Sequence, residues 1–219
     1  MLLRITNTAS GSDDLSIWLY RACATELSHV LSRPKLINFS INKGEVPRAW
    51  KQAVITPVPK TAPAVSVSDL RPISVTPVLS RIVESSVMRD LSPFIASQSL
   101  IDQYAYKATG STTETVGRML ENSLYVRCLL LDFSKAFDRV DRLILLKKLD
   151  TYHLPGNILS WIISFLTERS HSQCTKINGI VAVFECINRS IVQGSVIGPN
   201  SFSLYVADLK TLEKNQRFV

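Results

Sequence analysis

Residues 124–138 read LYVRCLLLDFSKAFD, and they decide how the rest of the 219-residue chain is interpreted. Leu124–Asp132 ends in an unbroken apolar run, which is typical of a strand buried on both faces. A carboxylate directly after such a strand is costly to hold unless something binds it, and a divalent metal ion offsets that cost. Asp132 is therefore a candidate metal ligand. Alternatively, Asp132 only caps the following turn and Asp138 lies in solvent, because acidic residues are common at strand ends.

The regions on either side of this stretch mix helix and strand signals without a strict alternation. Asn178-Gly179 predicts a hairpin between Gln173–Ile177 and Ile180–Ile187, since both turn positions accept a positive φ. Gln52–Val58 is the best strand candidate in the proline-rich segment from Val46 to Pro77. The chain is therefore expected to be an α+β protein.

Capping residues and prolines predict the helices. The expected helices run from Asp13 or Asp14 to about Ser32, from Thr76 to about Ala96, from Ser111 to about Asn122, from Arg142 to Tyr152, and from Pro155 to Thr167. In the first of them, the residues expected to face the core are Leu15, Trp18, Leu19, Ala22 and Leu27.

The composition limits the possible classes of protein. Hydrophobic residues make up 46% and charged residues 20%, which excludes a disordered or low-complexity chain. A net charge of +7 permits a polyanionic partner without requiring one. The four cysteines are scattered and form no C-x-x-C pair, so neither a zinc site nor a disulfide framework is expected. No apolar stretch suits a signal peptide or a membrane span, which indicates a soluble intracellular protein with no membrane partner.

Two further stretches are candidate binding elements. In Ile191–Pro199, IVQGSVIGP, two glycines would let the backbone approach a flat substrate closely; the alternative is an ordinary transition from loop to helix. In Asp69–Ser74, DLRPIS, Arg71 is a candidate phosphate contact, with Lys107 further downstream. The alternative for these basic residues is a solvated surface.

Taken together, the motifs closely resemble the reverse transcriptase of non-LTR (LINE-type, jockey-like) retrotransposons. They occur in the order WKQAVITPVPK, LRPISVTPVLSRIVE, DQYAYKATGSTTE, LLLDFSKAFDRVD and SIVQGSVIGP. The resemblance implies a right-hand polymerase fold, with a helical lead-in at residues 1–45, fingers at 46–123, an incomplete palm at 124–219 and no thumb.

The resemblance also implies roles for individual residues. Asp132 matches the catalytic aspartate that binds Mg²⁺, and Phe133 matches the neighbour whose backbone carbonyl completes the metal cage. Phe137 matches a bulky ring beneath the sugar, which excludes a 2′-hydroxyl and so favours deoxynucleotides. Gln193 and Gly194 match the loop that contacts the incoming nucleotide and the template.

Arg71 and Lys107 match basic finger positions near the triphosphate. The implied partners are an RNA template, a DNA primer and deoxynucleotides. In the intact family the primer 3′-hydroxyl attacks the α-phosphate of the nucleotide, with two Mg²⁺ ions stabilising the transition state.

One departure from the family concerns activity. Transfer with two metal ions needs more than one carboxylate, and the family supplies the others from a Tyr-x-Asp-Asp hairpin. Tyr205–Asp208 looks similar but is rejected, because position 207 is Ala and Leu204–Leu212 is expected to be a helix. The chain is therefore expected to be a truncated polymerase domain that is inactive alone. The alternatives are a non-catalytic nucleic-acid-binding remnant and a product that never folds stably.

Overall fold

A computed structural model describes residues 9–32, 36–97, 111–128, 132–167, 173–187 and 189–209. It combines helices with a four-stranded sheet, which confirms the α+β prediction. The helices are α1 (Ile17–Ala22), α2 (Ala24–Ser32), α3 (Ile37–Lys43), α4 (Val78–Ser97), α5 (Thr112–Glu121), α6 (Arg142–Asp150), α7 (Gly156–Leu166) and α8 (Gly198–Tyr205). The strands are β1 (Ala53–Pro59), β2 (Leu70–Val75), β3 (Gln173–Ile177) and β4 (Ile180–Val181).

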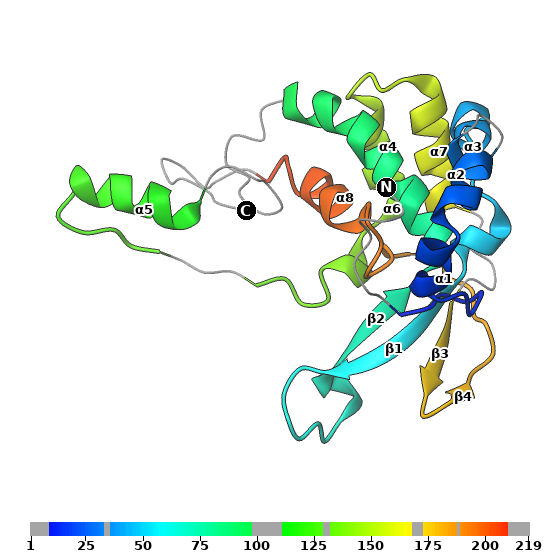
Figure 1. Cartoon of the computed structure of the whole chain (residues 1–219). Coiled ribbons are helices and arrows are strands. Elements are labelled where there is room, and N and C mark those ends of the chain that lie inside the picture. Colours follow the sequence, from blue (N-terminus) through cyan, green and yellow to red (C-terminus); the bar gives the residue numbers. More distant parts are fainter. Residues whose placement is uncertain are drawn as a thin grey trace.

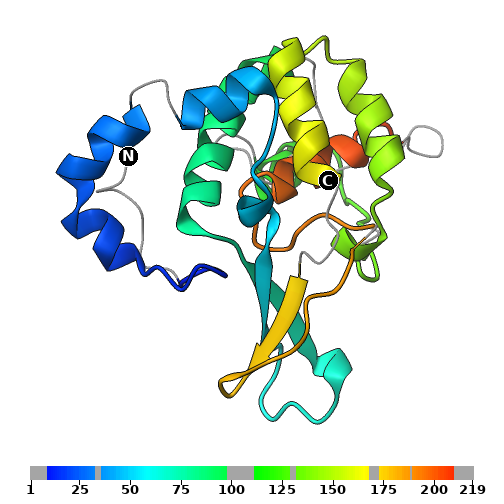
Figure 2. The ribbon, with the colours of Figure 1, turned by 90° about the vertical axis from the view of Figure 1, so that its right-hand side faces the viewer.

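The sheet has the order β2-β1-β3-β4 and extends from one end of the main helical cluster (Figure 1, Figure 2). The predicted strand at Gln52–Val58 is confirmed by β1, which pairs antiparallel with β2 along almost its whole length. Its parallel pairing with β3 covers Ala53 to Ile55. Pro57 follows two positions later and has no N–H to donate, so the proline limits how far β3 can continue this ladder.

The predicted hairpin forms, but its second strand is shorter than expected. Asn178 and Gly179 both have positive φ, at 50° and 83°, as the turn requires. β4 ends at Val181 instead of Ile187. Lys176 pairs with Val181, whereas Gln173 pairs with Glu185, so one extra residue is inserted between these two pairs. A bulge of this kind interrupts the ladder and explains the early end of β4.

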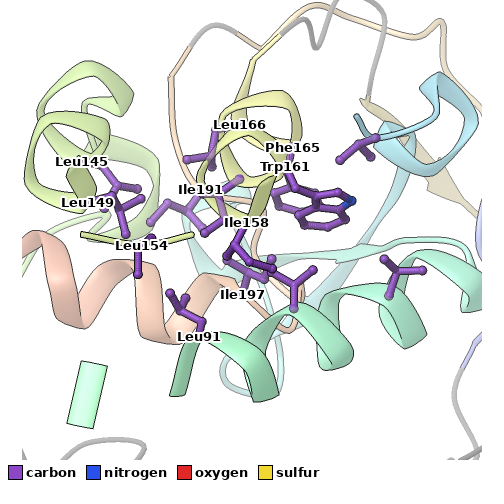
Figure 3. Packing of buried hydrophobic residues seen from close by; sticks show 14 of the residues in the cluster. Leu91, Leu145, Leu149, Leu154, Ile158, Trp161, Phe165, Leu166, Ile191 and Ile197 are labelled. Atoms are coloured by element: carbon purple, nitrogen blue, oxygen red, sulfur yellow. The ribbon is translucent and has the colours of Figure 1, made fainter. Parts of the chain in front are cut away.

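The main hydrophobic core lies between α4, α6 and α7 (Figure 3). α7 buries one continuous stripe at helical spacing, formed by Ile158, Trp161, Ile162, Phe165 and Leu166. Trp161 is fully buried, stacks on Phe165 at 5.5 Å between ring centroids, and donates from Nε1 to Ser40 Oγ at 3.0 Å. The packing of α7 therefore fixes α3 as well as the central helices.

The predicted helices at α4, α5, α6 and α7 are confirmed within a few residues of their expected ends. Ser111 caps α5 by accepting from the amide of Thr113 at 3.2 Å, as its sequence indicates. α5 buries none of its residues and lies apart from the main helical cluster (Figure 1).

The prediction of one long N-terminal helix is wrong. The segment forms α1 and α2, which are separated at Cys23. Ile17 and Tyr20 are buried, whereas Leu15 and Trp18, which were expected to face the core, have exposed fractions of 42% and 66%. The reason is that the helix begins at Ile17, so its buried face is set by the three-residue spacing from Ile17 to Tyr20. Leu27 packs against the cluster that contains Ile17 and Tyr20, as expected.

Two other predicted elements differ from the structure. The segment 124–128 at the start of the expected buried strand is irregular, and Leu124 and Tyr125 are exposed; residues 129–131 lie outside the described part. Of the helix expected at Leu204–Leu212, the described part shows α8 ending at Tyr205 with turns at residues 206–208, and residues 210–212 lie outside the described residues. Within the described residues, none of the helices has the length and apolar character needed to cross a membrane.

Replacing Trp161 with alanine should lower the free energy of unfolding by about 3–5 kcal/mol, because the change leaves a cavity in the core. The control is Ile163→Ala on the exposed side of the same helix, where a change of about 0.5 kcal/mol or less is expected. Urea unfolding followed by circular dichroism measures both. A wild-type product without a cooperative transition would support the alternative of a chain that never folds stably.

Candidate functional site

The loop containing Gln193 and Gly194 lies against the end of β2. The backbone amide of Ser74 donates to the Gln193 carbonyl at 2.8 Å. Gly194 has a φ of +103°, and a Cβ added to it would lie 2.4 Å from the Ser74 carbonyl oxygen. Gly194 therefore lets the backbone of the loop come close to the backbone of β2. Glycine is required here on two grounds, the backbone angle and the lack of space.

The other side of the loop is held by Glu84 of α4. This carboxylate is completely buried and accepts from the amide of Val196 at 2.8 Å and from that of Ile197 at 3.5 Å. Ser80, one turn earlier on α4, donates its hydroxyl to the same carboxylate at 3.0 Å. These bonds offset the cost of burying the charge. They also join α4 to the start of α8.

Sequence reasoning missed Glu84, although a signal was present. The residue lies on the face of α4 that also carries Val83 and Val87, and both of these are buried. An acidic residue in such an apolar stripe is rarely buried unless it is paired. The stripe indicates that Glu84 has a buried partner, but it does not say which segment supplies that partner.

The turn at Asp132–Asp138 lies beside the loop and α8. Phe137 stacks on Phe202 of α8 with ring centroids 5.1 Å apart, and Phe133 meets Phe202 edge to face at 6.0 Å. The Phe137 carbonyl accepts from the amide of Ile191 at 3.1 Å. Gln193 donates from Nε2 to Asp138 Oδ1 at 3.0 Å. Two motifs that are far apart in the sequence are therefore in direct contact.

A pocket of about 460 Å³ opens between this contact and the sheet. Its polar lining includes Asp138 and Gln193, and Ile55 and Ser74 contribute from β1 and β2. Asp132 is not among the lining residues. Asp138 is exposed, as the alternative expected, and its carboxylate also accepts a hydrogen bond from Gln193 at the pocket wall.

Arg142 fixes another wall of the pocket. Its guanidinium donates three hydrogen bonds of 2.8–2.9 Å to the carbonyl oxygens of Ile187, Arg189 and Ser190. All three of these residues line the pocket. Burial lowers the pKa of the Arg142 guanidinium from its usual value. Sequence reasoning missed Arg142 too, because a basic residue at the start of a helix is usually solvated.

The remaining predicted site residues are more dispersed. Asp132 is exposed, Phe133 has an exposed fraction of 50%, and Arg71 is exposed on β2 opposite Val58. Lys107 lies outside the described residues. The structure thus brings together Phe133, Phe137, Gln193 and Gly194 through α8 and β2, whereas Arg71 lies further along β2.

The acidic side chains of the described residues can supply one ligand to a metal ion, but they do not form a complete metal site. Across the described residues, no group of three or more His, Cys, Asp or Glu side chains could hold a metal ion. Asp138 is bonded to Gln193, Asp141 caps α6 by accepting from the amide of Leu143, and Asp208 pairs with Lys148. Of the predicted metal ligands, Asp132 is an exposed carboxylate available from solvent.

Comparison with known proteins decides the family. Residues 58–217 match the family described as reverse transcriptase (RNA-dependent DNA polymerase). The chain belongs to this family. The match spans both motifs that meet at the pocket, and the family resemblance expected from the sequence is confirmed. A reverse transcriptase domain implies the right-hand polymerase fold, and the family uses divalent metal ions.

The curated relatives are proteins of mobile elements. The chain is 29% identical over 186 residues to the RNA-directed DNA polymerase from mobile element jockey of Drosophila melanogaster, covering 80% of this chain and 20% of that protein. It is 27% identical over 173 residues to the probable RNA-directed DNA polymerase from transposon BS of the same fly, covering 74% and 19%. An uncharacterized 149 kDa protein of transposon TX1 from Xenopus laevis is 25% identical over 215 residues, covering 91% and 16%. The chain thus spans about a fifth of the length of these relatives.

Replacing Gly194 with alanine should destabilise the protein more than replacing Gly179. Both glycines have positive φ, so each alanine carries about 1–3 kcal/mol of backbone strain. A Cβ at Gly179 meets nothing within 4 Å, whereas one at Gly194 clashes with the β2 backbone. Urea unfolding of both variants isolates the clash. Equal losses would show that the loop does not need its close approach to β2.

Replacing Glu84 with alanine should lower the free energy of unfolding by about 3 kcal/mol, because the amides of Val196 and Ile197 lose their acceptor at about 1–3 kcal/mol each. Amide hydrogen exchange should rise selectively at Val196 and Ile197. The control is Ile82→Ala on the same helix, which packs against α1 and α2 and should destabilise without this local effect. Glu84→Gln keeps one acceptor oxygen and should fall between the wild type and Glu84→Ala. Unchanged exchange at both amides in Glu84→Ala would contradict the proposed anchoring.

Proposed function

We propose that this chain is the nucleotide- and template-binding part of a retrotransposon RNA-directed DNA polymerase. The observation that carries the proposal is the contact between Gln193 and Asp138 at a pocket beside β2. It joins the two motifs by which the chain resembles non-LTR reverse transcriptases. A polymerase must bring its nucleotide-binding loop to its catalytic turn, and a chance similarity of sequence would not require that contact.

The packing of Phe137 supports its role as the ring beneath the sugar. A steric filter has to be rigid, because a mobile ring would move aside for a 2′-hydroxyl. Stacking on Phe202 holds the Phe137 ring against α8. We propose that Phe137 excludes ribonucleotides, and that Gln193 and Gly194 contact the nucleotide and the template next to it.

Arg71 is proposed as a phosphate contact. It lies on β2, the edge strand of the sheet, so its guanidinium is open to a ligand. A planar guanidinium with several donors suits a triphosphate. Lys107 is proposed for the same task on the strength of the family resemblance. In this assignment residues 1–45 are the helical lead-in, residues 46–123 belong to the fingers and residues 124–219 to the palm.

Asp132 is proposed as a Mg²⁺ ligand, together with the backbone carbonyl of Phe133. When bound, the metal would neutralise charge on the substrate phosphates. Mg²⁺ usually takes one or two carboxylates along with substrate oxygens and water, and an exposed Asp132 suits one such position. Two ions roughly 3.5–4 Å apart need further carboxylates. We therefore propose that this chain does not extend primers by itself, and no catalytic step is assigned to it.

Nucleic-acid binding without catalysis is the second candidate function. It is favoured by the net charge of +7 together with the open position of Arg71 on the edge strand. Such binding would be largely independent of sequence and would weaken steeply as the salt concentration rises. The two candidate functions share one binding surface and differ in chemistry.

The wild-type chain should bind an RNA–DNA hybrid with a single-stranded RNA overhang at low salt, and Arg71→Ala should reduce the salt slope by about 1 because one phosphate contact is lost. Lys147→Ala removes an exposed charge from α6 and is the matched control, expected to leave the slope unchanged. Fluorescence anisotropy over a salt series measures both. Absence of binding at low salt would reject both candidate functions.

Primer extension on an RNA template with Mg²⁺ and deoxynucleotides separates the two candidates. The wild-type chain is expected to synthesise no DNA, because Asp132 cannot hold two ions alone. Detectable synthesis that is lost in Asp132→Asn would overturn the proposed inactivity and support Asp132 as the metal ligand. Synthesis that survives Asp132→Asn would reject Asp132 in that role.

A further inference from the structure

The hydrogen bond between Gln193 and Asp138 has a defined direction. Gln193 Nε2 lies 3.0 Å from Asp138 Oδ1. A carboxylate can only accept, so the nitrogen of the Gln193 amide must face it. Turning the amide over would bring two acceptor oxygens together. The pair therefore leaves Gln193 Oε1 as the atom that can accept a hydrogen bond from a third group.

Both residues are held in place by bonds that do not involve their side chains. The Gln193 carbonyl accepts from the Ser74 amide of β2 at 2.8 Å. The Asp138 amide donates to the Lys135 carbonyl at 3.0 Å, within the turn. A second backbone bond, from Ile191 to Phe137 at 3.1 Å, ties the loop to the turn. The two side chains thus meet across a fixed gap, which makes the direction of the amide a property of the fold.

We propose that Asp138 is a positioning residue, which orients the Gln193 amide so that Gln193 presents an acceptor to the bound nucleic acid. Because both residues line the pocket, the group that meets Gln193 Oε1 there must be a hydrogen-bond donor, while the second Nε2 hydrogen remains available to an acceptor. Two chemical sources of such a donor exist on the RNA template, the 2′-hydroxyl of a sugar and an amino or imino group of a base. This inference rests on the proposed function, since it assigns polarity to the same binding site.

The sharpest test exchanges the two side-chain chemistries. Gln193→Glu places two carboxylates against each other and should weaken hybrid binding by about tenfold or more. In the double variant D138N/Q193E, the introduced asparagine amide can donate to one oxygen of the introduced carboxylate while the other oxygen still accepts. The double variant has the same net charge as the wild type. Its binding should return to within about threefold of the wild type.

The single variant Asp138→Asn should weaken binding by about three- to tenfold, because an asparagine amide allows Gln193 to turn either way. Its control is Asp141→Asn, which makes the same change of charge three positions along the chain. Asp141 accepts from the amides of Leu143 and Ile144 at the start of α6, and asparagine caps a helix as well as aspartate does. Binding by the control should stay within about twofold of the wild type.

Anisotropy with the RNA–DNA hybrid measures every variant at one salt concentration. The proposal is overturned if the double variant binds no better than Gln193→Glu alone, or if Asp138→Asn matches Asp141→Asn. A template carrying 2′-O-methyl groups locates the donor. If the effect of Asp138→Asn disappears on that template, the donor is the 2′-hydroxyl; if the effect persists, the donor is on a base.

A second measurement does not depend on nucleic-acid binding. In a protein labelled with ¹⁵N-glutamine, the side-chain signal of Gln193 is identified by its loss in Gln193→Glu. Its NH₂ protons should be protected from exchange in the wild type and lose that protection by about tenfold in Asp138→Ala. If the wild type binds no hybrid, the proposed function is rejected, and the exchange rate of the Gln193 NH₂ protons still tests the hydrogen bond to Asp138. Unchanged exchange in Asp138→Ala would overturn the proposal that Asp138 orients Gln193.

Discussion

The buried carboxylate of Glu84 is the interaction on which the arrangement of the site depends. It bonds to the amides of Val196 and Ile197, at the point where the loop turns into α8. Without this acceptor, the amides of the partly buried Val196 and the buried Ile197 would lose their partner, at a cost on the order of 1–3 kcal/mol each. α8 in turn carries Phe202, on which Phe137 stacks. A single acidic side chain on α4 thus sets the position of an aromatic contact that belongs to a different pair of segments.

The loop is held from β2 as well, and this second anchor works by backbone contact. Gly194 comes so close to the Ser74 carbonyl that no side chain fits between them. This contact depends on the absence of a side chain at Gly194, whereas the contact from α4 depends on the carboxylate of Glu84. Together they restrict the position of Gln193, which lines the pocket along with Ile191 of the same loop.

Much of the fold could be predicted from the sequence because its signals are local. Caps and prolines located α4 to α7, and Asn178-Gly179 located the hairpin turn, since these residues act within a few positions of themselves. The apolar run at Leu124–Asp132 predicted a buried strand, but residues 124–128 are irregular and Leu124 is exposed, because an apolar run indicates burial without identifying the segment that would cover it. Phe137 and Gln193 were expected to be functional residues, and their segments do meet at one place. The Glu84 and Arg142 anchors and the Asp138–Gln193 pair join residues 45 to 113 positions apart, so no local pattern reveals them.

Both charged anchors bond to backbone groups of the pocket walls and the adjoining loop. Arg142 donates to three carbonyl oxygens, and Glu84 accepts from two amides. A backbone group is present whatever residue occupies the position, so the path of the pocket walls does not depend on which side chains line them. The side chains at positions 187, 189 and 193 can then suit the ligand of the pocket without changing the path of its walls. This division, with geometry set by buried charges and recognition set by the lining, explains how a site can keep its shape while one lining residue, such as Asp138, sets its polarity.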